Sequence, residues 1–287
     1  MPQTINTNLN SLNAQRNLAS SQMQLSTSMQ RLSSGLRVNS AKDDAAGMAI
    51  AERMNSQVRG MNVAVRNAND GISMAQTAEG SLGKVTDSLQ RMRELAVQAT
   101  NATVSGTDKD SLDKEFGELS KEIQRVLGAT SFNGHKVLAG DAGTLSFQVG
   151  ANTTSNDTVD IVTKDLTIDT SITDVAGTDN TGASRSLIDS TASATTIQGV
   201  IDKIDGALKT VSGERAGLGA SQNRLDSVVS NLQVSVENQS AARSRIMDAD
   251  FASETANLSR AQILQQAGNA MVAQANQLPQ QVLALLR

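Results

Sequence analysis

The chain has 287 residues, with 25 basic and 29 acidic side chains, four phenylalanines, and no cysteine, tryptophan or tyrosine. The lack of cysteine excludes disulfides and thiolate metal sites, and the intermixed charges leave neither a basic stripe nor an aromatic stacking surface for a nucleic acid. Its apolar content is aliphatic and its only prolines are Pro2 and Pro279, so the composition favours long helices that pack through narrow seams.

The first segment predicts an amphipathic helix, because its apolar residues recur at steps typical of one helix face. Ser33–Gly35 interrupt this helix, and Ser40 is expected to cap the next one, with Asp43 in its first turn. The N-terminus lacks the apolar core of a secretory signal, and no apolar run reaches the ~18–20 residues of a membrane span, so no membrane insertion is expected. The apolar positions of the segment include Ile5, Leu9, Leu12, Leu25, Met29 and Leu32.

A second long helix is predicted up to about residue 100, followed by a turn-rich stretch at 101–108 and a shorter helix at 112–126. Its second half carries two series spaced by seven residues, which together predict a coiled-coil seam of alternating small and large side chains. These series are Ala75, Leu82, Leu89 and Ala96, and Ala78, Val85, Met92 and Ala99.

The period changes to two near residue 140, which predicts β-strands. Leu145, Phe147 and Val149 alternate with polar residues, as do Val159 and Ile161, and residues 150–157 between them are typical of a hairpin loop. Leu166, Ile168 and Ile172 could add a further short strand. Residues 173–194 are rich in Asp, Thr, Ser, Gly and Asn, which favours a loop or a reduced surface domain.

The most regular repeat lies in the second half of the chain and predicts a helix of roughly 50 residues, which needs packing partners along its length. A break is expected at 247–250. A last helix then repeats its apolar residues every seven positions. The two series are Ile197, Ile204, Val211, Leu218, Leu225 and Leu232, and Leu264, Met271, Leu278 and Leu285.

These patterns predict a mainly α fold, in which the two chain ends form a long antiparallel coiled-coil bundle and a small β-hairpin region lies in the middle. We expect an inner terminal domain of 1–42 with 248–287, a bundle domain of 43–164 with 195–247, and a short variable surface region at 165–194. One pair of terminal helices cannot cover both of their wide apolar stripes, so further copies of the chain are expected to do so.

No catalytic, cofactor or metal-binding constellation is found in the sequence. The only histidine, His135, follows Asn133-Gly134 and is expected in a surface turn. Gly213, Gly217 and Gly219 fall inside a heptad helix and not after a strand, which argues against a phosphate-binding loop. The sequence therefore predicts that the chain is not an enzyme and uses no cofactor.

Several stretches at both ends of the chain resemble bacterial flagellins. The likeness covers roughly residues 1–150 and 195–287 and leaves out the middle, where a stretch this short implies that the large outer domains of longer flagellins are missing. The stretches are RLSSGLRVNSAKDD (31–44), NANDG (67–71), LQRMRELAVQ (89–98), AARSRI (241–246), SRAQILQQAG (259–268) and QANQLPQQVLALLR (274–287).

The resemblance implies a structural subunit that polymerises into the extracellular flagellar filament used for swimming. It also implies export of the unfolded chain and addition at the distal tip, with an export chaperone, a filament cap and hook-associated junction proteins as partners. The alternatives are a hook–filament junction protein, a cytosolic coiled-coil scaffold and an enzyme. Formation of filaments by the purified protein would separate a flagellin from a scaffold.

The resemblance further implies a patch recognised by the flagellin-sensing Toll-like receptor of animal hosts, at positions matching Gln90, Arg91, Leu95 and Glu115. Arg91 and Leu95 are four residues apart, so we expect them to share one face of their helix. The alternative is an ordinary solvated helix face. The residues expected to drive self-assembly are the apolar residues of the two terminal helices. Those expected in the inner seam are Leu82, Leu89, Leu218, Leu225 and Leu232.

Overall fold

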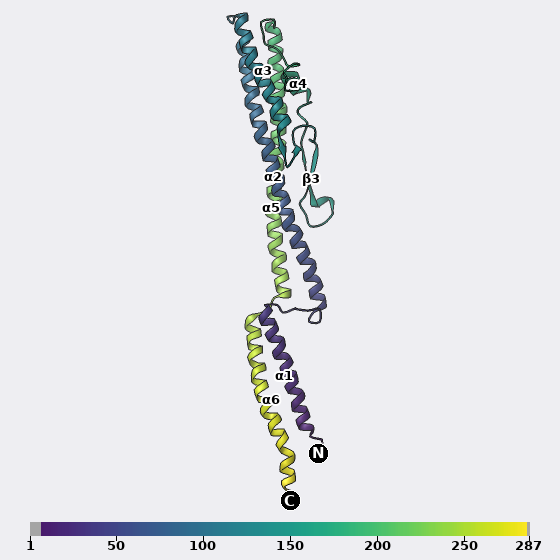
Figure 1. Cartoon of the computed structure of the whole chain (residues 1–287). Helices are drawn as coiled ribbons and strands as arrows, with labels where there is room; N and C mark the ends of the chain where they lie inside the picture. The colour runs from purple at the N-terminus through teal and green to yellow at the C-terminus, as the bar shows by residue number, and fades with distance from the viewer. Residues whose placement is uncertain (1–6, 286–287) are drawn as a thin grey trace. The chain divides into compact units, whose positions relative to one another are not determined.

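The computed structural model describes the backbone of residues 7–285 and the side chains of residues 7–277. The chain divides into two compact units, unit 1 (Met1–Ser56 with Glu237–Arg287) and unit 2 (Gln57–Val236). The mainly helical prediction is confirmed (Figure 1). The helices are α1 (Leu9–Ser34), α2 (Ala45–Thr100), α3 (Gly106–Ala129), α4 (Thr170–Ala176), α5 (Ala194–Met247) and α6 (Phe251–Leu285).

In unit 1, α1 and α6 lie side by side and run antiparallel (Figure 1). The Asn8 side chain caps α1 by accepting a hydrogen bond from the Ser11 N–H, and it also donates to the Ala275 carbonyl at 2.7 Å. At the other end of α1, Gly35 adopts the left-handed conformation (φ 70°) and donates to the Arg31 carbonyl. A glycine is favoured here because it reaches this conformation without steric cost.

The start of α2 differs from the prediction that Ser40 is its cap. The Asp43 carboxylate accepts hydrogen bonds from the Ser40 N–H and hydroxyl at 2.9 and 3.0 Å, which closes a separate turn. Asp44 is the residue that caps α2, because its Oδ1 accepts from the Gly47 N–H at 2.8 Å. A carboxylate next to the first turn also interacts favourably with the helix dipole.

The breaks predicted at both ends of the chain are present and hydrogen-bond to one another within unit 1. The Arg37 N–H donates to the Met247 carbonyl at 2.7 Å, and the Ala249 N–H donates to the Gly35 carbonyl at 2.9 Å. The Arg37 guanidinium adds a bond to the Ile246 carbonyl at 2.7 Å. Each break therefore provides hydrogen-bond partners for backbone N–H and carbonyl groups of the other break.

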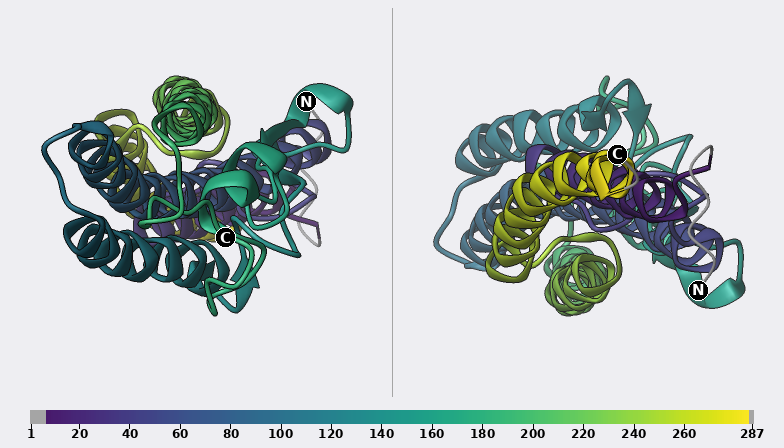
Figure 2. Two further views of the ribbon diagram at one scale, coloured as in Figure 1. Left: turned by 90° about the horizontal axis from the view of Figure 1, so that it is seen from above. Right: turned by 90° about the horizontal axis from the view of Figure 1, so that it is seen from below.

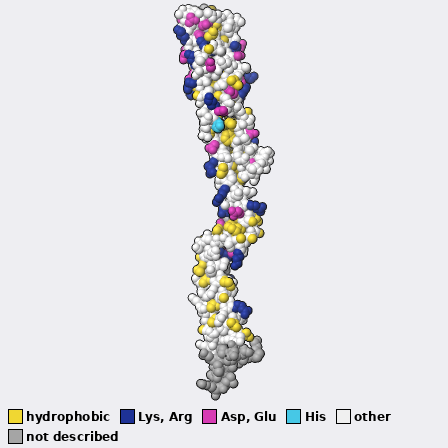
Figure 3. Space-filling model, turned by 45° about the vertical axis from the view of Figure 1, so that its right-hand side comes forward, with side chains coloured by type: hydrophobic (Ala, Val, Ile, Leu, Met, Phe, Trp, Pro, Cys, Tyr) yellow, Lys and Arg dark blue, Asp and Glu magenta, His cyan; other side chains and the backbone are white. Residues whose placement is uncertain are grey.

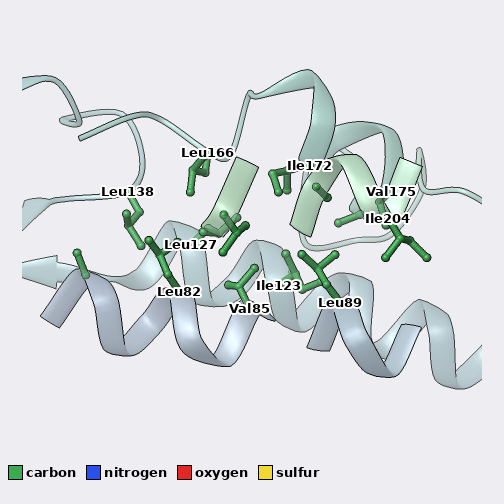
Figure 4. Packing of buried hydrophobic residues seen from close by; sticks show 14 of the residues in the cluster. Leu82, Val85, Leu89, Ile123, Leu127, Leu138, Leu166, Ile172, Val175 and Ile204 are labelled. Carbon is green, nitrogen blue, oxygen red and sulfur yellow. The ribbon is translucent and has the colours of Figure 1, made fainter. Parts of the chain in front are cut away.

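Unit 2 has a core made mainly by α2, α3 and α5, which appear as adjacent helices in the view from above (Figure 2). At the predicted seam positions, Leu82, Leu89, Leu218 and Leu225 are buried, whereas Leu232 is only half-buried. Figure 4 shows Leu82 of α2 beside Leu127 of α3 and Leu89 of α2 beside Ile123 of α3, in a cluster that also contains Ile204 of α5. Mainly aliphatic side chains thus fill the space between these three helices.

Two small antiparallel hairpins follow α3. The first joins β1 (Ser131–Phe132) to β2 (His135–Lys136) through Asn133 (φ 50°) and Gly134 (φ 84°), and His135 is exposed after this tight turn. The second is the predicted hairpin: β3 (Thr144–Gln148) pairs with β4 (Thr158–Val162), with Phe147 opposite Val159. A short 3₁₀ turn, η1 (Ser155–Asp157), lies in its loop.

Residues 164–193, here called the strap, differ from the prediction of a strand followed by a surface loop. No strand forms at 166–172. The Asp169 side chain instead caps α4, and Ile172 and Val175 are buried one helical turn apart while Ile168 is exposed. Further along, Ile188 is also fully buried. The strap contributes to the core of unit 2, because its scattered apolar residues cover α3.

A buried ion pair fastens the strap to α3. The Arg185 guanidinium makes two bonds to the Asp113 carboxylate, at 2.8 and 2.5 Å, and also lies over the Phe116 ring at 5.9 Å. Asp113 accepts a third bond from the Ile188 N–H at 3.0 Å. Nearby, the Gln124 side chain donates to the Gly177 carbonyl. These bonds satisfy the polar groups that burial of the strap removes from water.

Candidate assembly surface and receptor patch

Packing of α1 on α6 leaves an apolar surface exposed on unit 1. Leu9 and Leu12 of α1 are 68% and 49% exposed, and Met271 of α6 is 64% exposed. Met29 and Leu264 are also exposed, whereas Leu25 and Leu32 are half-buried. Exposed apolar surface of this extent is characteristic of interaction sites and is uncommon on isolated soluble domains.

The residues that α1 and α6 bury against each other are mostly small or polar. Ser11 and Ser28 of α1 are 5% exposed, and Ala261 and Ala275 of α6 are also buried. The apolar stripes predicted to drive self-assembly therefore do not mainly serve the pairing of α1 with α6. Of the predicted assembly residues, Ile5 lies outside the described residues, as do the side chains of Leu278 and Leu285.

Few charges interrupt this apolar surface. Arg16 and Arg31 are the ionisable residues within α1, and Glu254 and Arg260 are those within α6. Figure 3 shows hydrophobic side chains scattered over unit 1 with few charged side chains among them. Because the surface carries few charges, burying it against another protein removes few charged groups from water and costs little free energy.

The predicted receptor patch is only partly assembled. Arg91 donates to Glu115 at 2.8 Å and to Glu94 at 2.9 Å, and all three side chains are exposed. Hydrogen bonding to Glu115 and then to Glu94 raises the pKa of Arg91 above its ordinary value. Gln90 is exposed on the same helix. The structure thus brings together residues of α2 and α3 that are 24 positions apart in the sequence.

Leu95 is not part of this exposed patch, so the expectation that it shares a face with Arg91 is wrong. Leu95 is 1% exposed and belongs to the core. Both α3 and α5 pack against α2. The buried face of α2 is therefore wider than it would be in a coiled coil of two helices. The exposed apolar residue near the patch is Val97, which the sequence did not single out. Its neighbour Arg93 pairs with Asp205 of α5 at 2.7 Å.

Among residues 7–277, no cluster of His, Asp and Glu side chains has an arrangement suited to a metal ion. Within the described part of the chain, no helix combines the length and the apolar character of a membrane span.

Comparison with known proteins identifies the family. The N-terminal helical region of bacterial flagellins matches residues 5–142, and the C-terminal helical region matches residues 201–286. A flagellin of Halalkalibacterium halodurans is 47% identical over 284 residues and 99% of each chain. A flagellin of Xenorhabdus nematophila is 45% identical over 315 aligned positions and the whole of each chain.

A solved structure described as a flagellar hook-associated protein from Vibrio parahaemolyticus shares the fold, with a TM-score of 0.61 and 15% identity over 72% of this chain and 100% of that one. At this identity the likeness shows the fold alone, whereas the full-length identity to flagellins shows the family. The fold and the matches together define a structural subunit of the extracellular flagellar filament, and not an enzyme. The chain belongs to the bacterial flagellin family.

Proposed function

We propose that the exposed apolar stripes of α1 and α6 are the surfaces through which this flagellin polymerises into a filament. The observation that carries the proposal is the exposure of Leu9, Leu12 and Met271 after α1 and α6 have paired. Burying a leucine or methionine side chain contributes roughly 1.5–3 kcal/mol, so several such residues per subunit can stabilise a contact between copies. Further copies of the same chain are the natural partners, because a filament repeats one surface many times.

Removal of the terminal helices tests this role. Deleting residues 1–40 or 250–287 is expected to leave a soluble fragment, because the core of unit 2 lies outside both segments. Neither truncated protein should elongate filament seeds viewed by electron microscopy, whereas the full chain should. Circular dichroism checks that unit 2 remains helical. Filaments formed by either truncated protein would contradict the proposal.

We also propose for this chain the export route and the partners that the resemblance to flagellins implies. The subunit is exported unfolded and added at the distal tip, with an export chaperone, a filament cap and hook-associated junction proteins as partners. The lack of cysteine supports this route, since a chain that is unfolded for export needs no disulfide to refold. The seam between α1 and α6 also supports export of an unfolded chain, because it is made mostly of small or polar residues. Two helices that bury so little apolar surface against each other gain much of their stability from assembly.

We further propose that the monomer is recognised by the flagellin-sensing Toll-like receptor through Gln90, Arg91 and Glu115. The exposed Arg91–Glu115 pair supports this proposal, because it presents a planar guanidinium beside an acceptor for a partner's donors. Leu95 is left out because it is buried. The alternative is that these residues form only a solvated helix face, and the receptor assay below distinguishes the two.

Arg91→Ala is expected to weaken receptor activation by monomeric protein roughly tenfold, if Arg91 anchors the contact. The measurement is a receptor reporter assay across a dilution series, with circular dichroism to confirm folding. Arg93→Ala is the matched control, because Arg93 is on the same helix and also forms an exposed ion pair, with Asp205. Equal potency of the Arg91 and Arg93 variants would show that the patch is an ordinary helix face.

A further inference from the structure

Polar contacts join the start of α1 to α6 at the end of unit 1 that lies away from the two breaks. The Asn8 side-chain amide donates to the Ala275 carbonyl at 2.7 Å, and the Ser11 hydroxyl donates to the Asn276 side-chain oxygen at 2.7 Å. Ala275 is only 8% exposed and Ser11 only 5%. These bonds connect residues 267 and 265 positions apart, so they fasten the two ends of the chain to each other.

The Ala275 carbonyl differs from the other carbonyls of α6 because of the proline that follows it. In an α-helix, each carbonyl accepts a hydrogen bond from the N–H four residues later. Four residues after Ala275 is Pro279, which lies inside α6 and has no backbone N–H. The Ala275 carbonyl therefore lacks its ordinary partner within the helix. A buried carbonyl without a hydrogen bond is destabilising, and the Asn8 amide provides the missing donor.

The Asn8 side chain uses its two polar atoms for two different helices. Its oxygen caps α1 by accepting from the Ser11 N–H at 3.2 Å, while its nitrogen donates to α6. Asparagine, aspartate and serine are all strong N-cap residues. Among these three, only asparagine carries an acceptor and a donor on separate atoms. A single side chain can therefore begin α1 and hold it against α6 at the same time.

We propose that Pro279 is a positioning residue for the pairing of the chain ends in the filament subunit. Because it has no N–H, Pro279 leaves the Ala275 carbonyl free to accept from Asn8, and this bond holds the start of α1 at one place on α6. The other end of the pair is closed by the backbone bonds between the two breaks. The helix α1 is therefore fastened to the C-terminal part of the chain at both of its ends.

This contact makes the last turns of α6 depend on α1. Without α1, the Ala275 carbonyl has neither an N–H from residue 279 nor the amide of Asn8, so α6 is weakened just before Pro279. When α1 packs against α6, the Asn8 bond offsets that weakness. The C-terminal end of the chain is thus fully stabilised only with the N-terminal end in place. This coupling goes beyond the proposed role of the exposed stripes, because both of its partners belong to one chain.

Filaments grown from the full chain provide the test, because their subunits are assembled whether or not α1 and α6 pair in the free chain. Asn8→Ser keeps an oxygen that can cap α1 but removes the amide donor. Pro279→Ala gives the Ala275 carbonyl an N–H partner within α6. Amide hydrogen exchange of residues 9–14 is followed by mass spectrometry. Each variant is added as an isotopically labelled minority to unaltered subunits, so that a variant that polymerises poorly alone can still be measured.

Each single variant is expected to raise the exchange rate of these α1 amides about two- to tenfold, because one hydrogen bond between the helices is lost. If Asn8 served only as a cap, Asn8→Ser would leave the rate unchanged. The double variant should exchange no faster than either single variant, because each change removes the same bond. The matched control, Pro279→Ala with Gln280→Pro, keeps a proline in α6 but frees the Asn276 carbonyl, and it should behave like Pro279→Ala.

The proposal is overturned if Asn8→Ser or Pro279→Ala leaves the exchange of α1 as it is in the unaltered chain, or if the effects of the two changes add. It is also overturned if the relocated proline at position 280 restores the slow exchange, since any proline in α6 would then serve. Seed elongation by variants of the exposed stripes is scored separately. Normal elongation by those variants would count against the proposed assembly surface and not against the contact between Asn8 and Ala275.

Discussion

Replacing Leu225 by alanine is expected to lower the free energy of unfolding of unit 2 by about 2–5 kcal/mol. Leu225 is fully buried in the heptad seam of α5. Its Cδ1 lies 3.0 Å from the position that a Cβ on Gly71 would occupy, and the Phe147 ring reaches the same place. Because α5, α2 and the β3–β4 hairpin meet at this side chain, its removal leaves a cavity that three elements would have to close.

The measurement is urea unfolding of the full chain, followed by circular dichroism, with the midpoint and slope of the transition fitted separately. Val234→Ala is the matched control, because Val234 lies on the same helix and is 55% exposed. The control should shift the midpoint little. If Leu225→Ala and Val234→Ala gave the same midpoint as the parent, Leu225 would not be a core residue.

Replacing Asp113 by alanine is expected to cost about 3 kcal/mol, because it leaves the largely buried Arg185 guanidinium without its partner. The Asp113 and Arg185 side chains are only 13% and 12% exposed, and the Ile188 N–H would lose its acceptor as well. The strap should then separate from α3 and expose Ile172 and Val175. Urea unfolding measures the loss in the free energy of unfolding, and amide hydrogen exchange shows whether local unfolding begins in the strap.

Asp110→Ala is the control for this change. Asp110 lies one turn earlier on α3 and also accepts a bond from the strap, from the Ser190 N–H at 2.9 Å, but it is exposed. Its replacement should therefore be much less destabilising. A double variant, Asp113→Ala with Arg185→Ala, should lose less than the sum of the two single losses. Additive losses would show that the two side chains do not act as a pair.

The contribution of Asp113 should also depend on pH. Burial raises the pKa of Asp113, but the bonds from Arg185 and from the Ile188 N–H outweigh it and hold the pKa below its ordinary value. The unfolded chain therefore binds this proton at a higher pH than the folded chain does. The stabilisation is fully present above the unfolded pKa, about 3.9, and is lost as the pH falls through the lower folded pKa. The difference between parent and Asp113→Ala should narrow over this acidic range.

The periodic parts of the fold could be predicted from the sequence, because their burial follows the helix or strand repeat. Leu218 and Leu225 are buried where the seven-residue series of α5 predicts, and Phe147 and Val159 lie on the two hairpin strands that the alternation predicts. The strap could not be predicted in this way. Its buried residues, Ile172, Val175 and Ile188, are too widely spaced for a repeat, and Asp113 and Arg185 are 72 positions apart.

The candidate sites show the same division. The apolar stripes of α1 and α6 could be predicted, but periodicity alone does not say which face of a helix pairs within the chain and which remains exposed. Leu12 remains exposed, whereas Ser11 beside it is buried. The prediction for Leu95 is wrong for a related reason. Sequence spacing places Leu95 on the face of Arg91, but only tertiary packing shows that α3 covers it.

We expect neighbouring copies in the filament to cover the exposed apolar stripe of the terminal helices. Seeded polymerisation of a Leu12→Ser, Met29→Ser double variant tests it most directly, because both side chains are about half exposed in the folded chain (49% and 51%). The control removes two exposed apolar side chains of unit 2, through Val162→Ser and Leu187→Ser. Light scattering and electron microscopy are expected to show seed elongation by the control and none by the Leu12, Met29 variant, while circular dichroism shows both folded. Normal elongation by the Leu12, Met29 variant would contradict the account.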